Sequence, residues 1–142
     1  MEFKQRFAVL ISTWFGCGLS KFAPGTCGSI AALPVSWGLY LTGDWHTLAF
    51  GTIIIFALGV WASNVYCQNQ TEETDPPQVV IDEVAGQCLT LLVVPPNLGY
   101  YMIGFIIFRF FDIIKPWPVS WADRNVKGGL GIMLDDILAG VY

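Results

Sequence analysis

The chain has 142 residues, of which 54% are hydrophobic and only 13% are charged. This composition lies outside the range of ordinary soluble domains and indicates a single membrane domain over residues 1–142. The net charge is −4 and the seven Lys and Arg residues are scattered. They form no basic face, which excludes nucleic acid as a partner.

Five apolar stretches follow one another along the chain and predict an all-α fold: 30–41, 48–65, 84–94, 98–114 and 130–142. The second best approaches the roughly 20 residues that a straight span requires. Pro34 interrupts the first and the third is short, so these two are expected to be half-membrane helices or to span with neighbouring residues included. The sequence therefore predicts a polytopic membrane helical bundle with some short or half-membrane helices.

The connecting segments predict an orientation. The turns at 42–47 and 95–97 contain no Lys or Arg, whereas the N-terminal segment and the segment after residue 114 do. By the positive-inside rule the two turns face outward and the other connections face the cytoplasm. Apart from Asp44, the acids then lie on or near the inner face: Glu2, Glu72, Glu73, Asp75, Asp82, Glu83, Asp112, Asp123, Asp135 and Asp136.

Several of these acids stand in apolar surroundings, where an unpaired charge costs several kcal/mol. Simpler roles exist for each: Asp82 or Glu83 could cap a helix, and Arg109 and Asp112 share a helix face as an i, i+3 ion pair. Either Asp135 or Asp136 could likewise cap a helix. These roles explain single acids better than the set. The set predicts a shared metal site, and oxygen ligands suit Mg²⁺; the candidate ligands are Asp82, Glu83, Asp112, Asp135 and Asp136.

The segment Phe-Ala-Pro-Gly-Thr-Cys-Gly-Ser at 22–29 opens into the first apolar stretch. Backbone N–H groups and hydroxyls at a helix start suit a phosphate, although ordinary capping by Thr26 or Ser29 stays open. His46 is the only histidine and lies in an outer turn, so histidine-dependent phosphatases lack their base. The mechanism that remains is hydrolysis assisted by a metal ion that carboxylates hold. The candidate phosphate-binding residues are Gly25, Thr26, Ser29, Arg109, Lys115 and Arg124.

A rival interpretation is a small membrane transporter or channel in which Arg109, Asp112 and Asp135 line a polar path. It predicts charges distributed through the depth of the membrane, whereas an enzyme predicts charges gathered at one interface. A purely structural membrane subunit would leave the acids unexplained.

Segments 22–29, 80–87, 108–118 and 121–140 resemble, in order and spacing, the motifs of the phosphatidylglycerophosphatase A family. The resemblance implies an all-helical, Mg²⁺-dependent enzyme of the bacterial inner membrane. Such an enzyme removes the terminal phosphate of the phospholipid phosphatidylglycerophosphate to give phosphatidylglycerol. The resemblance singles out Asp123 in addition to the metal and phosphate candidates named above.

From the chemistry, we expect Asp82, Glu83, Asp112 and Asp136 to be catalytic, with their site facing the cytoplasm. The acyl tails are expected to lie among Phe105, Phe108 and Phe110. Many relatives continue into a further apolar segment, whereas the last helix expected here, about 13 residues, is too short for an ordinary span. Its end is expected to lie within the bundle or to pack against a second copy in a homo-oligomer.

Overall fold

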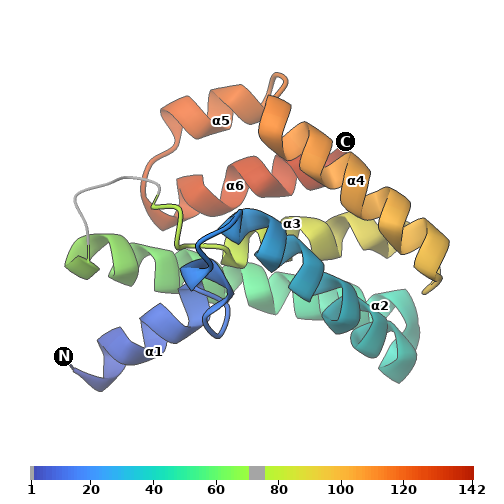
Figure 1. Cartoon of the computed structure of the whole chain (residues 1–142), viewed down its shortest axis with the longest axis horizontal. Helices are drawn as coiled ribbons and strands as arrows, with labels where there is room; N and C mark the ends of the chain where they lie inside the picture. Colours follow the sequence, from blue (N-terminus) through green and yellow to red (C-terminus); the bar gives the residue numbers. More distant parts are fainter. Residues whose placement is uncertain (1, 71–75) are drawn as a thin grey trace.

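The structure, a computed structural model, describes residues 2–70 and 76–142, and within them every regular element is helical (Figure 1). The all-α expectation is confirmed. Glu72, Glu73 and Asp75 lie outside the described residues. The elements are α1 (Phe3–Ser12), η1 (Cys17–Leu19), α2 (Pro24–Gln70), α3 (Ile81–Thr90), η2 (Leu91–Val93), α4 (Leu98–Ile114), α5 (Val119–Asn125) and α6 (Gly128–Val141).

The first two apolar stretches both belong to α2, which has a break at Gly43 and Asp44. Asp44 has a φ of 60°, and the chain reverses direction there (Figure 1). The two arms then pack closely against each other. At Gly51 of the second arm, an added Cβ would lie 2.7 Å from the Leu39 side chain of the first arm. Pro34 lies inside the first arm without ending it, so the interruption expected from proline does not occur.

Helices α1 and α5 lie where the apolar pattern predicted none. Both are short, and both contribute to the interior through a few small or branched side chains. Ala8 and Ile11 of α1 are buried, as are Val119 and Ala122 of α5. Their buried positions are too few to form an apolar stretch in the sequence.

Helix α3 lies between α2 and α6 (Figure 1) and packs mainly against these two. It approaches α6 closely at two glycines: a side chain at Gly140 would meet the Gly86 carbonyl oxygen at 2.6 Å, and one at Gly86 would meet the Asp136 carbonyl oxygen at the same distance. Asp82 precedes Gly86 by four residues, as Asp136 precedes Gly140, so each acid shares a helix face with its glycine. The close contact therefore draws the two carboxylates together.

Large apolar side chains cover the outside of the bundle, most densely on α4. Ile106, Phe110 and Ile113 of α4 are 61%, 55% and 69% exposed. Proteins that are soluble as monomers rarely expose apolar surface of this extent. Within the described residues, Pro24–Asn69, which comprises the two arms of α2 on either side of the break, is apolar enough to cross a membrane, and only 39% of its most apolar part is buried. This favours a membrane location, while the polytopic arrangement stays a prediction.

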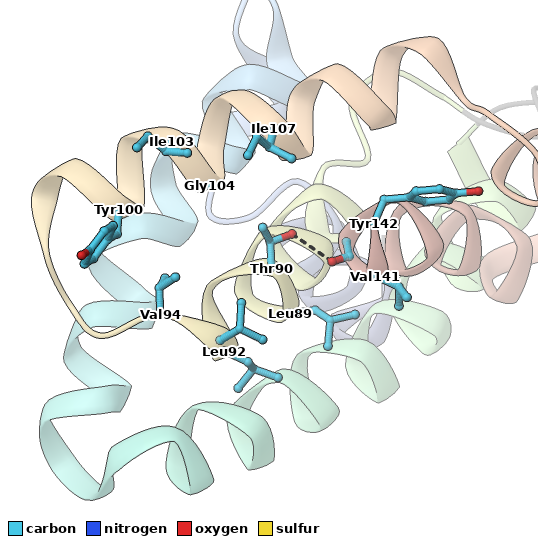
Figure 2. Close-up of a pocket in the computed structure, with 12 residues that line it drawn as sticks. Leu89, Thr90, Leu92, Val94, Tyr100, Ile103, Gly104, Ile107, Val141 and Tyr142 are labelled. Atoms are coloured by element: carbon cyan, nitrogen blue, oxygen red, sulfur yellow. Dashed lines mark hydrogen bonds between the residues drawn. The ribbon is translucent and has the colours of Figure 1, made fainter.

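An apolar pocket of about 370 Å³ lies between the end of α3 with η2, the first half of α4 and the end of α6 (Figure 2). Ile103 and Ile107 form one wall and Leu89 and Leu92 another. The hydroxyl of Thr90 is already used, because it donates to the carbonyl oxygens of Gly86 and Gly140. No charged residue lines this pocket, so the charged chemistry of the chain lies elsewhere.

Candidate active site

A second cavity, of about 320 Å³, collects most of the candidate residues. It lies where the N-terminal end of α3 meets the start of α2, the end of α4 and the middle of α6. Its lining residues are Ala23, Pro24, Gly25, Pro76, Pro77, Val79, Asp82, Glu83, Arg109, Asp112, Lys115, Asp135 and Asp136. Residues separated by more than 100 positions in the chain thus share one cavity.

Three carboxylates form the centre of this cavity. One oxygen from each of Asp82, Glu83 and Asp136 lies within 4.8 Å of the other two. Asp82 and Asp136 are 6% and 3% exposed, and each of the three side chains has a buried oxygen without a hydrogen-bond partner among the described residues. Buried acceptors of this kind call for a donor or a cation, so the donor set fits a divalent cation with oxygen ligands.

The electrostatics agree with this fit. Burial raises the pKa of Asp82 well above the usual aspartate range, and the nearby carboxylates of Glu83 and Asp136 raise it further. Burial likewise raises the pKa of Asp136, with Asp112 and Glu83 adding to the effect. Burial is also the main reason that the pKa of Glu83 is raised. Three acids that each disfavour their charged form gain most from a shared positive ion.

The simple capping roles do not hold in the structure. Asp82 and Glu83 lie in the first turn of α3, where the helix dipole favours them, but the helix has no side-chain cap bond. Asp135 and Asp136 lie in the middle of α6, well beyond its N-terminus at Gly128. Helix capping therefore explains neither pair.

Arg109 and Asp112 do form the expected ion pair on one face of α4. Their side chains are 17% and 11% exposed, so the pair is largely withdrawn from solvent. Both residues line the cavity beside the three carboxylates. The pair places a guanidinium group at the wall of a cavity that Lys115 also lines.

Lys115 ends α4 in a left-handed conformation, with a φ of 51°. Its Nζ donates to Asp123 of α5 at 2.8 Å and to Asp135 of α6 at 3.1 Å. Burial disfavours the charge of Lys115, but these two carboxylates outweigh it and raise the pKa of the amine. Asp135 thus lies beside an ammonium group, and Asp123, which the resemblance singled out, contacts the same amine.

The remaining phosphate candidates divide between the cavity and its surroundings. Gly25 lines the cavity, and a side chain there would come within 2.3 Å of Glu83 Oε1. Ser29 is buried and its hydroxyl donates to the Gly25 carbonyl oxygen. Arg124 is exposed and lines a separate pocket of about 90 Å³ that shares Asp135 with the cavity. In the described part of the chain, the lining of the larger cavity includes neither Arg124, Ser29 nor Thr26.

Sequence reasoning missed Gln87, a fully buried residue of α3 whose carboxamide has no hydrogen-bond partner among the described residues. It follows Glu83 by one helical turn. A neutral amide in an apolar stretch is a weak signal, and only its i, i+4 spacing from an acid could have drawn attention to it.

Comparisons with known proteins agree with the motifs. The chain matches the family described as phosphatidylglycerophosphatase A over residues 10–142. A protein of Escherichia coli (strain K12) named phosphatidylglycerophosphatase A is 41% identical over 133 residues, covering 93% of this chain and 76% of the relative. A Haemophilus influenzae protein of the same name is 37% identical over 138 residues, covering 94% of this chain and 82% of the relative.

A Bacteroides thetaiotaomicron protein, provisionally named a phosphatidylinositol-3-phosphatase, is 44% identical over 142 residues, covering 94% of this chain and 87% of the relative. No solved structure gives a significant match. With the family match extending over nearly the whole sequence, the chain belongs to the phosphatidylglycerophosphatase A family.

Proposed function

We propose that this protein is a membrane-associated, Mg²⁺-dependent lipid phosphatase that converts phosphatidylglycerophosphate to phosphatidylglycerol and inorganic phosphate. The substrate follows from the names of the two relatives called phosphatidylglycerophosphatase A. The observation that carries the chemistry is the group of Asp82, Glu83 and Asp136, whose oxygens lie within 4.8 Å of one another in a cavity.

The three carboxylates of this group are the residues that would hold the cation, and Asp112 stands beside them. A bound Mg²⁺ supplies positive charge that stabilises the phosphoryl oxygens as negative charge develops on them. In the proposed reaction a water oxygen bonds to phosphorus, the bond from phosphorus to the glycerol oxygen breaks, and the glycerol oxygen takes up a proton from the water. Asp112 is suited to orient this water, because it lies on the cavity wall.

The cationic residues have separate roles in this scheme. Arg109 lies on the cavity wall and offers its guanidinium to the phosphate oxygens. Lys115 is a fixed charge and a poor acid, because Asp123 and Asp135 raise its pKa. We assign Lys115 to charge balance and to holding α5 and α6 together. We assign Arg124, which is exposed outside the cavity, to contact with the lipid headgroup as it approaches.

The lipid tails are proposed to remain in the bilayer beside α4. Phe110 is 55% exposed on that helix, near Arg109, and suits this contact. Phe108 does not, because it is 1% exposed and packs in the interior with Val119 and Ala139. The expectation that Phe108 meets the tails was therefore wrong.

The transporter alternative is less well supported by the arrangement of charges. It requires Arg109, Asp112 and Asp135 to follow a path through the bundle. Instead, all three line the one cavity that also contains the carboxylate group. Charges gathered at a single place favour hydrolysis over conduction.

The decisive experiment measures phosphate release from phosphatidylglycerophosphate in detergent micelles, with Mg²⁺ and with excess chelator. We expect wild-type turnover to depend on Mg²⁺ and Asp82→Asn to lower it by about 10²-fold or more, because the cation loses a ligand. Asp44→Asn is the matched control, since Asp44 is exposed at the break in α2, away from the cavity. Full activity of Asp82→Asn, or of the wild type in chelator, would contradict the scheme.

The same assay should include phosphatidylinositol 3-phosphate, because the Bacteroides relative carries that name. We expect phosphatidylglycerophosphate to be the better substrate. A reversed preference would keep the metal-assisted chemistry but replace the proposed substrate.

A further inference from the structure

Gln87 is a polar side chain with no exposed surface in the apolar interior of the bundle. Neither its Oε1 nor its Nε2 has a hydrogen-bond partner among the described residues. Buried amides are normally paired, and an unpaired one costs about 1–3 kcal/mol. A side chain of this kind is expected to acquire its partners in the working state of the site.

The other buried side-chain atoms without partners among the described residues include Glu83 Oε2, which is an acceptor, and Arg109 Nε, which carries a hydrogen to donate. The carboxamide of Gln87 offers one group of each kind, since its Nε2 donates and its Oε1 accepts. The four atoms therefore make up two complementary donor–acceptor pairs.

The positions of the three residues permit these pairs. Glu83 and Gln87 are four residues apart on α3 and so lie on the same face of the helix, one turn apart. Glu83 and Arg109 meet at Gly25. A Cβ at that glycine would lie 2.3 Å from Glu83 Oε1 and 3.3 Å from Arg109 Nη1.

The neighbours of Gln87 indicate its direction. On one side, Gly86 faces the ring of Phe108 on α4 and the Asp136 carbonyl oxygen on α6, each 2.6 Å from a Cβ placed there. On the other side, the thiol of Cys88 accepts a hydrogen bond from Ser36 of α2. Gln87 lies between these two positions on the face of α3, so its neighbours include α2 and α4, the two helices that bring Gly25 and Arg109 to Glu83.

We propose that Gln87 is a positioning residue that links Glu83 to Arg109, donating from Nε2 to the carboxylate and accepting at Oε1 from the guanidinium Nε–H. It touches neither the substrate nor the reacting atoms. Its effect is to hold the carboxylate that faces the cation and the guanidinium that faces the phosphate in one arrangement. The inference rests on the cation site of the proposed function, and partners of ligating carboxylates typically change metal affinity by about 10–100-fold.

The test measures Mn²⁺ binding to the detergent-solubilised full chain by electron paramagnetic resonance, without any lipid substrate. We expect Gln87→Leu to weaken Mn²⁺ binding by about 10-fold. Its metal-free Tm should be unchanged or higher, because an apolar side chain replaces an unpaired amide. Ser63→Ala is the matched control: Ser63 is also fully buried with an unpartnered side chain among the described residues, but it lies in the second arm of α2 and not one turn from Glu83 on α3.

A second variant, Gln87→Glu, keeps the size and the acceptor but loses the donor to Glu83, so it should also bind Mn²⁺ more weakly than the wild type. Mn²⁺ affinity within twofold of the wild type in either variant would overturn the inference. So would a lower metal-free Tm of Gln87→Leu with unchanged affinity, or a wild type that binds no Mn²⁺. A wild type that binds Mn²⁺ but releases no phosphate from the lipid would refute the proposed function and leave the role of Gln87 standing.

Discussion

The variant Gly25→Ala tests whether the position of the Glu83 carboxylate limits turnover. The added Cβ would lie 2.3 Å from Glu83 Oε1 and 3.2 Å from its Cδ. Ordinary contacts are more than 3 Å long, so the carboxylate must retreat by about 1 Å, and a misplacement of that size can cost about 10²-fold in rate. The moving group is the end of a flexible side chain, so the fold itself should lose little stability.

The assay follows phosphate release from phosphatidylglycerophosphate together with thermal unfolding of the same preparation in detergent. Gly38→Ala is the control, because a Cβ there would meet nothing within 4 Å and alanine favours the helix. We expect the control to retain full activity and Gly25→Ala to lose about 10²-fold with a similar Tm. Full activity of Gly25→Ala would refute the assignment of Glu83 to the working site.

Three further variants test single contacts within the helical bundle, each by thermal or denaturant unfolding of the solubilised chain. Lys115→Met should cost about 1–3 kcal/mol by removing a donor to Asp135. The pKa of Lys115 in the folded protein is raised above 10.5, so the amine is fully protonated and stabilises the fold at any pH below that value. The loss of stability in Lys115→Met should therefore be the same throughout pH 7 to 9, and a loss that varies over this range would contradict the assignment. Gly129→Ala should cost about 1–3 kcal/mol, because its Cβ would lie 2.2 Å from the Val60 carbonyl oxygen, and unchanged stability would contradict that contact. Asn97→Ala removes the side chain that caps α4 through Gly99 N and should cost about 1 kcal/mol; a smaller loss than in an exposed Asn125→Ala control would refute the cap.

Much of the fold could be predicted because apolar patterns are strong signals. The predicted stretch at 98–114 coincides with α4, which ends at Ile114 just before Lys115. Pro34 misled the prediction, because a helix can continue through proline when the surrounding packing compensates for the lost hydrogen bond. Helices α1 and α5 escaped notice because they bury only a few residues each.

The site shows the same division between strong and weak signals. Acids in apolar surroundings stand out, and Asp82, Glu83, Asp112 and Asp136 do come together at one cavity. The partners of Lys115 could not be predicted, since they depend on how α5 and α6 fold back against the end of α4.

The carboxylate group draws its members from helices that begin at Ile81 and at Gly128. Neither helix can form the group by itself. A chain that ends before α6 would keep most of its helical content but would lack Asp136, the third oxygen donor. Phosphatase activity should therefore require that α3 and α6 are both packed in the bundle. Chains that are partially folded or that lack α6 should be inactive rather than partly active.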